Sequence, residues 1–202
     1  GMELHFEAQS RDLTRDIFVG NTLVSMYGKC GAIEEAKNVF ISLDQHTLVS
    51  WNAMLSALVD QQEGEKALLL YRQMQEENVS FDQLTFVISL QACGIIANCD
   101  EKDAKKGHLA MEIGQGLHVD AHRKGYTSLS IVGNTLVSMY GKCNALVEAE
   151  YAFDRLCNRT LVSWNAMSST YVECGHGKRA LQFLKKMQED GIIPDAVTFL
   201  IC

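Results

Sequence analysis

Four asparagines recur at matching places along the sequence and carry its most regular side-chain chemistry. Asn21 and Asn134 lie 113 positions apart, and so do Asn52 and Asn165. A carboxamide offers hydrogen-bond donors and an acceptor on one planar group, so it can read the polar edge of a nucleobase. Asparagine is also a favoured residue at helix starts, where it caps or bridges helices. Residue type alone leaves both interpretations open.

Two histidines at helical spacing, His118 and His122, are the best candidates for a metal site. The positions that match them in an earlier copy of the same segment are His5 and Gln9, so the ligand pair is absent from one copy. The sequence contains no HExxH, glycine-rich phosphate loop, GxSxG or zinc-deaminase pattern. We therefore expect no catalytic residue, no metal and no cofactor in this chain.

Long phrases of the sequence occur twice, at a constant offset of 113 residues. The phrase "VGNTLVSMYGKC" occupies Val19–Cys30 and returns at Val132–Cys143. The phrase "TLVSWNAM" occupies Thr47–Met54 and returns at Thr160–Met167. Self-similarity at a fixed period indicates a repeat architecture, in which each repeat packs on its neighbours.

The 113-residue block itself divides into three shorter repeats, which open on related phrases. The predicted boundaries are a partial repeat at 1–16, complete repeats at 17–47, 48–82, 83–129, 130–160 and 161–195, and a partial repeat at 196–202. The repeat at 83–129 is about a dozen residues too long, with an insertion near 95–113. The charged run "DEKDAKK" within it predicts a solvated loop or a helix extension, and a docking element for a partner is the alternative.

Each repeat is predicted to form two helices. In the repeat at 17–47, a Cys30-Gly31 break separates two apolar segments, and the second has apolar residues at spacings of three and four. These residues are Ile33, Ala36, Val39, Phe40 and Leu43. Neither helix can bury its apolar stripe alone, so stacked helix pairs are expected to share one continuous core.

Composition limits the classes of protein that remain. Apolar residues make up 47% of the chain, which is enough for a packed core, and no run is long enough to cross a membrane. The seven cysteines are odd in number and form no CxxC pair, so we expect small buried thiols and not a disulfide framework or zinc ribbon. The net charge of −7 counts against phosphate binding, although a local basic stripe is compatible with it.

The phrases "VGNTLVSMYGKCGAIEEAKNVF", "LVSWNAM", "ALLLYRQMQEENVSFD", "QLTFVISLQACG" and "GMELH" resemble the plant-type pentatricopeptide repeats that alternate short, standard and long repeats. The resemblance spans the whole chain. It implies an all-α fold, a right-handed α-solenoid of stacked helix-turn-helix repeats. It also implies residence in a mitochondrion or plastid, with the targeting peptide outside this segment, and single-stranded RNA bound along the inner surface, one base per repeat.

The resemblance assigns a role to three positions of each repeat. The fifth residue reads the base edge, which selects Asn21, Asn52, Asn134 and Asn165. The last residue is the second reader, which selects Thr47, Asp82, Thr160 and Asp195. The second residue packs against base faces, which selects Phe18, Val49, Ile131 and Val162.

The same resemblance indicates which bases would be bound. An Asn-Asp pair looks like a uracil reader, and an Asn-Thr pair suggests a pyrimidine. The long repeat offers Val87 and Leu129, which cannot hydrogen-bond a base. The predicted RNA register is pyrimidine, U, unread, pyrimidine, U, and the expected process is RNA editing, processing or stability.

A second function class remains open. The acidic balance, the silent long repeat and its insertion favour a scaffold subunit that holds other protein subunits of a large organellar assembly. Aromatic residues do not decide between the two, because Trp51, Trp164, Tyr27 and Tyr140 all fall within apolar stripes and are expected in the core.

Overall fold

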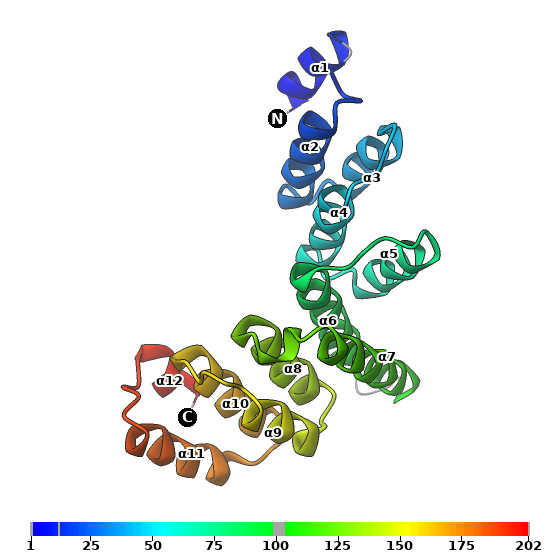
Figure 1. Ribbon diagram of the computed structural model, residues 1–202. Helices are drawn as coiled ribbons and strands as arrows, with labels where there is room; N and C mark the ends of the chain where they lie inside the picture. Colours follow the sequence, from blue (N-terminus) through cyan, green and yellow to red (C-terminus); the bar gives the residue numbers. More distant parts are fainter. Residues whose placement is uncertain (1, 12, 99–103, 202) are drawn as a thin grey trace. The chain divides into compact units, whose positions relative to one another are not determined.

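The computed structural model describes residues 2–11, 13–98 and 104–201, and all regular structure in these ranges is helical. The residues fall into two compact parts, Gly1–Ala92 and Cys93–Cys202, each of which is described by itself. Within each part the helices follow one another in pairs joined by short turns (Figure 1). The prediction of an all-α fold is confirmed.

In the N-terminal part the first helices of successive pairs form one row, the inner row, and the second helices form another, the outer row (Figure 1). They are α1 (Met2–Ser10), α2 (Ile17–Lys29), α3 (Ile33–Ser42), α4 (Leu48–Asp60), α5 (Gly64–Glu76) and α6 (Gln83–Asn98), the last of which continues into the C-terminal part. Helix α2 packs against both α3 and α4, so the first helices of consecutive pairs are neighbours.

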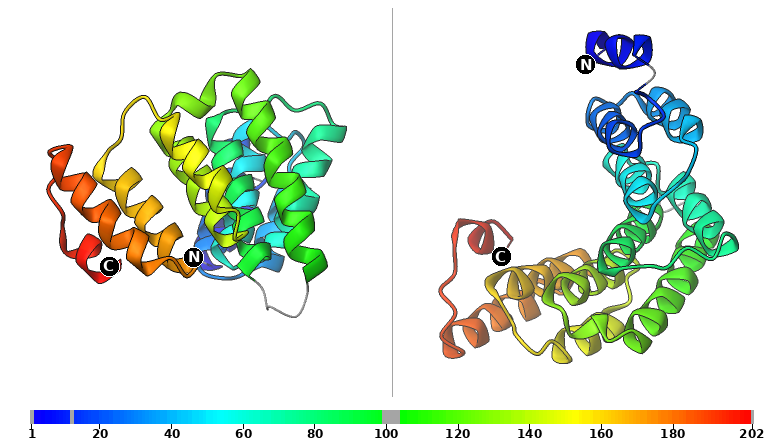
Figure 2. Two further views of the ribbon diagram at one scale, coloured as in Figure 1. Left: turned by 90° about the horizontal axis from the view of Figure 1, so that it is seen from below. Right: turned by 45° about the horizontal axis from the view of Figure 1, so that its top comes forward.

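The C-terminal part repeats this arrangement (Figure 2). Its helices are α7 (Ala104–Arg123), a short 3-10 helix η1 (Tyr126–Ser128), α8 (Ser130–Lys142), α9 (Leu146–Asp154), α10 (Leu161–Glu173), α11 (Gly177–Glu189) and α12 (Ala196–Ile201). Helix α10 packs against α8, α9, α11 and α12. The first helices α8, α10 and α12 begin at Ser130, Leu161 and Ala196.

Local sequence sets where these first helices begin and end. The Asp16 carboxylate accepts hydrogen bonds from the backbone N–H groups of Phe18 and Val19 at the start of α2. Thr47 and Ser50 form a reciprocal capping box at the start of α4. Gly31 closes the turn after α2 with a φ of 76°, a conformation that favours glycine.

The core lies both between the two helices of each pair and between one pair and the next. Trp51 and Trp164 are fully buried, as expected, and Tyr27 and Tyr140 join them in the core. Phe40 meets Trp51 edge to face at a centroid distance of 5.0 Å, and this packing recurs in the C-terminal part. Burial of these rings explains why they are unavailable as stacking platforms for a ligand.

First helices of consecutive pairs approach closely because small residues lie where they meet. A Cβ placed on Gly28 of α2 would overlap the Cβ of Ala57 in α4. A Cβ placed on Gly141 of α8 would lie 2.6 Å from the hydroxyl oxygen of Thr170 in α10. The glycines therefore set the spacing between first helices, and with it the spacing of any side chains that these helices present.

The described residues of the predicted insertion are helical. Residues 95–98 belong to α6 and residues 104–113 to α7, while residues 99–103 lie outside the described residues. Ile95 and Ile96 are buried, so this end of α6 is part of the core, and residues 104–106 of the charged run lie in the first turn of α7. A docking role for this segment stays a prediction.

The expectation of small buried thiols holds for one cysteine among those that the structure describes. Cys93 is buried, Cys143 and Cys174 are half-buried, and Cys30 and Cys157 are exposed, all as free thiols. The exposed pair was predicted wrongly, because both follow the last turn of a helix and lie outside its apolar stripe. Over the described residues, no helix combines the length and apolar character needed to span a membrane.

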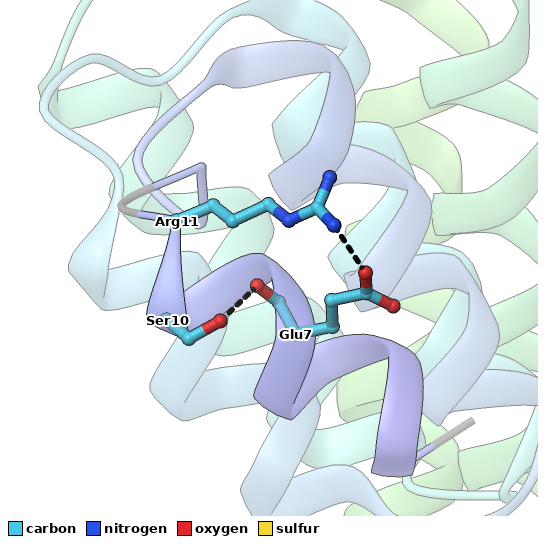
Figure 3. A network of polar contacts seen from close by, with 3 residues as sticks. All are labelled: Glu7, Ser10 and Arg11. Atoms are coloured by element: carbon cyan, nitrogen blue, oxygen red, sulfur yellow. Dashed lines mark hydrogen bonds and ion pairs between the residues drawn. The ribbon is translucent and has the colours of Figure 1, made fainter.

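The end of α1 is held by local polar contacts (Figure 3). The Arg11 guanidinium lies 2.6 Å from the Glu7 carboxylate, and the Ser10 hydroxyl donates to the Glu7 carbonyl at 2.7 Å. All three side chains are exposed, so the ion pair contributes little to stability.

Candidate functional site

The first helices of the N-terminal part line an open groove of about 910 Å³. Its wall is built from α2, α4 and the first turn of α6. The lining residues are Asn21, Thr22, Ser25, Met26, Lys29, Cys30, Val49, Asn52, Ala53, Ser56, Ala57, Asp60 and Leu84. The groove therefore brings together two of the predicted base readers, Asn21 and Asn52, with the predicted packing residue Val49.

The second residue of each repeat is an apolar side chain held in solvent. The predicted members of this set are Phe18 (83% exposed), Val49 (63%), Ile131 (55%) and Val162 (64%). Two more residues occupy the same place and were missed in the sequence, Leu84 (46%) and Val197 (51%). Leu84 lines the groove together with Val49. Asn52 therefore shares the groove with an exposed apolar side chain of its own repeat, Val49, and with one of the next repeat, Leu84.

Asn52 is joined to the start of the next first helix by a closed hydrogen-bond network. Its Nδ2 donates to Oδ1 of Asp82 at 3.2 Å, and its Oδ1 accepts from the Thr85 hydroxyl at 2.9 Å. Asp82 also caps α6, since its Oδ1 accepts from the backbone N–H of Thr85 at 2.9 Å. The two predicted readers of this repeat are thus in direct contact, and Asn52 is 5% exposed.

The C-terminal part contains the same network. Asn165 Nδ2 donates to Asp195 Oδ1 at 3.3 Å, and the Thr198 hydroxyl donates to Asn165 Oδ1 at 2.8 Å. The backbone N–H of Thr198 donates to Asp195 Oδ1 at 2.9 Å. Thr85 and Thr198 were not among the predicted site residues. The signal that could have found them is the shared threonine and phenylalanine of "QLTFV" and "AVTFL" at the start of the two helices.

The network favours the ionised form of both aspartates. Burial raises the pKa of the Asp82 carboxyl, but hydrogen bonds from Thr85, Asn52 and the Leu84 backbone outweigh burial and hold the pKa below its ordinary value. The Asp195 pKa is lowered chiefly by the backbone and side-chain hydrogen bonds of Thr198. At neutral pH each carboxylate is therefore an acceptor for N–H donors.

Asn21 and Asn134, the fifth residues of the short repeats, have different surroundings. Their Oδ1 atoms are buried and have no hydrogen-bond partner among the described residues. The last residues of these repeats, Thr47 and Thr160, hydrogen-bond instead with Ser50 and Ser163 in the capping boxes that begin α4 and α10. In the short repeats, therefore, no hydrogen bond is seen between the asparagine and the last residue of the repeat, all four of which the structure describes.

The long repeat lacks polar atoms at the matching side-chain positions. Val87, its fifth residue, is buried in α6, and Leu129, its last residue, is exposed before α8. Neither side chain can donate or accept a hydrogen bond, which agrees with the chemistry expected from their types.

Charges of opposite sign alternate at the ends of the first helices. Lys29 ends α2 and Asp60 ends α4, and both line the groove. Lys142 ends α8 and Glu173 ends α10 in the C-terminal part. Burial raises the pKa of the Glu173 carboxyl, and the nearby Lys142 ammonium partly offsets this rise. The first helix of each short repeat thus ends on a lysine, and the first helix of the repeat that follows it ends on an acidic residue.

The two histidines considered as metal ligands have other partners. His118 Nδ1 lies 2.8 Å from the Tyr140 hydroxyl, as His5 Nδ1 lies 2.7 Å from that of Tyr27. His122 Nδ1 lies 3.3 Å from the Thr127 hydroxyl. Nowhere in ranges 2–11, 13–98 and 104–201 do three or more potential metal ligands gather.

Family models match more than half of the 202 residues. Residues 46–94 and 159–202 match the model described as the PPR repeat family, and residues 21–46 match the model described as the PPR repeat. The matches cover all of the groove-lining residues of α2, α4 and α6.

Curated relatives from Arabidopsis thaliana match nearly the whole chain. The pentatricopeptide repeat-containing protein At4g39530 is 34% identical over 93% of this chain and 21% of its own length. The chloroplastic protein CRR2 is 33% identical over 99% of this chain and 29% of its own length. The mitochondrial protein At3g09040 is 34% identical over 96% of this chain and 18% of its own length. The chain thus spans less than a third of each of these relatives.

A solved structure shares the fold. The crystal structure of the pentatricopeptide repeat protein PPR10 from maize matches 99% of this chain and 27% of its own chain, with a TM-score of 0.73 and 22% sequence identity. This match supports the predicted solenoid of helical repeats.

Proposed function

The chain belongs to the pentatricopeptide repeat family, and from this premise we propose that it holds a single RNA strand along its first helices, one base per repeat. The observation that carries the proposal is the groove of the N-terminal part. There Asn21, Val49, Asn52 and Leu84 lie on one wall, at the fifth and second positions of consecutive repeats.

The apolar side chains of the groove suit the faces of unstacked bases. Val49 and Leu84 are exposed although burial would be favourable for both, and no described part of the chain covers them. A base inserted between the two would bury both side chains and its own faces, which is the usual way that single-stranded RNA is held. The same reasoning extends to Phe18, Ile131 and Val162 in their repeats.

The polar side chains suit the base edge. The Asn52 amide donates one N–H to Asp82 and lines the groove, so we propose that its second N–H meets a base there, while the ionised Asp82 carboxylate can accept an N–H. Uracil presents carbonyl acceptors beside an N–H donor, so it matches this pair, and Asn165 with Asp195 offers the same pair. We propose U at these two repeats and a pyrimidine at the repeats of Asn21–Thr47 and Asn134–Thr160.

A role in organellar RNA editing, processing or stability follows as part of the proposal. Relatives carry the words mitochondrial and chloroplastic in their names, and we propose the same kind of compartment for this chain. Lys29 and Lys142 are the cations at the first-helix ends that would meet backbone phosphates.

A protein partner is the second candidate, and the outer helices favour it. Ile41 of α3 is 64% exposed and Leu69 of α5 is 66% exposed in the N-terminal part. Val147 of α9 and Leu181 of α11 are likewise exposed in the C-terminal part. Apolar side chains on the outer row, on a chain of net charge −7, suit a scaffold that holds other protein subunits.

Binding to a pool of randomised short RNAs tests the first candidate. We expect bound RNAs to be enriched in pyrimidines, with U at the places facing Asn52 and Asn165. The purified chain should also carry absorbance at 260 nm if it retains RNA. Bound RNAs with no enrichment at any place, or no bound RNA at all, would favour the scaffold.

A further inference from the structure

The four asparagines of the fifth positions differ in what lies against the amide oxygen. Asn52 and Asn165 receive a hydrogen bond from the hydroxyl of Thr85 and Thr198 respectively. Asn21 and Asn134 have a buried amide oxygen with no partner among the described residues. The difference correlates with the third residue of the next repeat. That residue is threonine after Asn52 and Asn165, and serine after Asn21 and Asn134.

Orientation of a carboxamide depends on its hydrogen-bond partners, because its oxygen and nitrogen ends have nearly the same shape. At Asn52 both ends are determined. The Thr85 hydroxyl lies 2.9 Å from Asn52 Oδ1 and 2.8 Å from Asp82 Oδ1, so its one proton is shared between these two acceptors, and the Asp82 carboxylate accepts from Asn52 Nδ2. A rotated amide would place its oxygen against the ionised Asp82 carboxylate. Repulsion between the negatively charged oxygens of the two groups disfavours this orientation.

The short repeats lack this control at both ends of the amide. The Ser50 hydroxyl lies 3.0 Å from the Thr47 hydroxyl, inside the cap of α4, where it replaces the threonine that bonds the asparagine elsewhere. Thr47 carries a hydroxyl, which can donate or accept and so does not select one end of an amide. The Asn21 amide is therefore not fixed by either neighbour.

We propose that Thr85 and Thr198 are positioning residues for base recognition, which lock the amides of Asn52 and Asn165 so that each presents an N–H to the RNA. The inference rests on the proposed function and deepens it. It assigns strong base discrimination to the repeats of Asn52 and Asn165 and weak discrimination to the repeats of Asn21 and Asn134. Specificity thus depends on a residue of the following repeat, 33 positions further along the chain.

Replacement of the hydroxyl by a methyl group tests the lock. In Thr85→Val the affinity ratio between U and the other bases, at the place facing Asn52, should fall by about fivefold to tenfold. Thr85→Ser retains the hydroxyl and should restore most of the ratio. Ser50→Ala is the matched control, because it removes a capping hydroxyl at the same place in the neighbouring repeat and should leave every ratio unchanged.

A second readout uses the RNA-free chain. The side-chain amide signals of Asn52 in a nitrogen-proton NMR spectrum should shift in Thr85→Val and stay in place in Ser50→Ala. Thr198→Val should likewise shift the side-chain amide signals of Asn165. This second variant tests the proposal if Thr85→Val does not fold.

The outcomes separate the two proposals. If the parent chain shows base preference and Thr85→Val keeps it, the positioning role is overturned while RNA binding stands. If the Asn52 amide signals do not respond to Thr85→Val, the lock is overturned in the same way. If the parent chain has no preference among RNAs, the proposed function fails and the inference falls with it.

Discussion

Lys29 and Asp60 end the neighbouring first helices α2 and α4 and line the same groove with opposite charges. An RNA strand along this groove would meet an attractive and a repulsive side chain in turn. Asp60 therefore weakens the affinity for RNA phosphates that Lys29 provides in the same groove.

Reversal of the charge at position 60 should strengthen RNA binding. Asp60→Lys is expected to raise affinity for a pyrimidine-rich RNA several-fold at low salt. Each added phosphate contact should steepen the dependence of log affinity on log salt by about 0.7. Fluorescence anisotropy across a potassium chloride series measures both. Asp44→Lys, an equal charge change outside the groove lining, is the control, and equal gains from the two variants would contradict a groove-specific role.

Truncation of an exposed apolar residue should separate binding from stability. Val49 is 63% exposed, so Val49→Ser should leave the thermal midpoint nearly unchanged. Loss of packing against a base should weaken RNA binding by about fivefold, which corresponds to about 1 kcal/mol. Ile41→Ser on the outer helix α3 removes a side chain of similar exposure and should not alter RNA affinity. Equal affinity of parent and Val49→Ser would remove Val49 from the binding surface.

Removal of the Asn52 amide should affect both RNA binding and stability. Asn52→Ala deletes the amide that we propose reads the base, so affinity for a U-containing RNA should fall by about tenfold and base choice should relax. It also removes one hydrogen bond each from Asp82 and Thr85, which keep their bonds to one another, at a cost of about 1–2 kcal/mol in unfolding free energy. Gel shifts and urea unfolding measure the two effects. A variant that loses stability but keeps its base preference would show that Asn52 only bridges helices.

The Asp82 carboxylate should give the chain a specific acid dependence. Its pKa lies below the ordinary value in the folded state, because hydrogen bonds from Thr85 and Asn52 outweigh the effect of burial. Folding therefore favours the ionised form, and the stabilisation is complete above the unfolded pKa of about 4. It is lost as pH falls through the folded pKa. The gap in unfolding free energy between parent and Asp82→Asn should be constant near pH 7 and narrow below about pH 4. A gap that widens in acid would contradict this.

A methyl group at the contact between first helices should destabilise the N-terminal part. Gly28→Ala places a Cβ against Ala57, so α2 and α4 must separate, at a cost of about 1–3 kcal/mol. Gly107→Ala is the matched helical control, since a Cβ there meets nothing within 4 Å and should be neutral or stabilising by about 0.5–1 kcal/mol. Thermal unfolding of both variants provides the comparison. Similar midpoints for the two would mean that the close approach does not set the helix spacing.

The sequence by itself determined the helices and their grouping into pairs. Apolar spacing, capping residues and glycine turns act over a few residues, so one helix on each side of the Cys30-Gly31 break could be anticipated, where α2 and α3 lie. The same locality explains why Trp51 and Tyr27 were correctly expected in the core. Where the pattern was interrupted, around residues 95–113, local reasoning did not reveal that Ile95 and Ile96 are buried.

Only the tertiary structure decided what each asparagine touches. Asn52 and Thr85 are 33 residues apart, and their contact depends on how the start of α6 lies against α4. Asn21 occupies the same position in its own repeat, yet its amide oxygen has no partner among the described residues. A hydrogen bond requires its two groups to meet within a few tenths of an ångström, and stacking of one helix pair on the next fixes that geometry in a way that residue spacing does not encode.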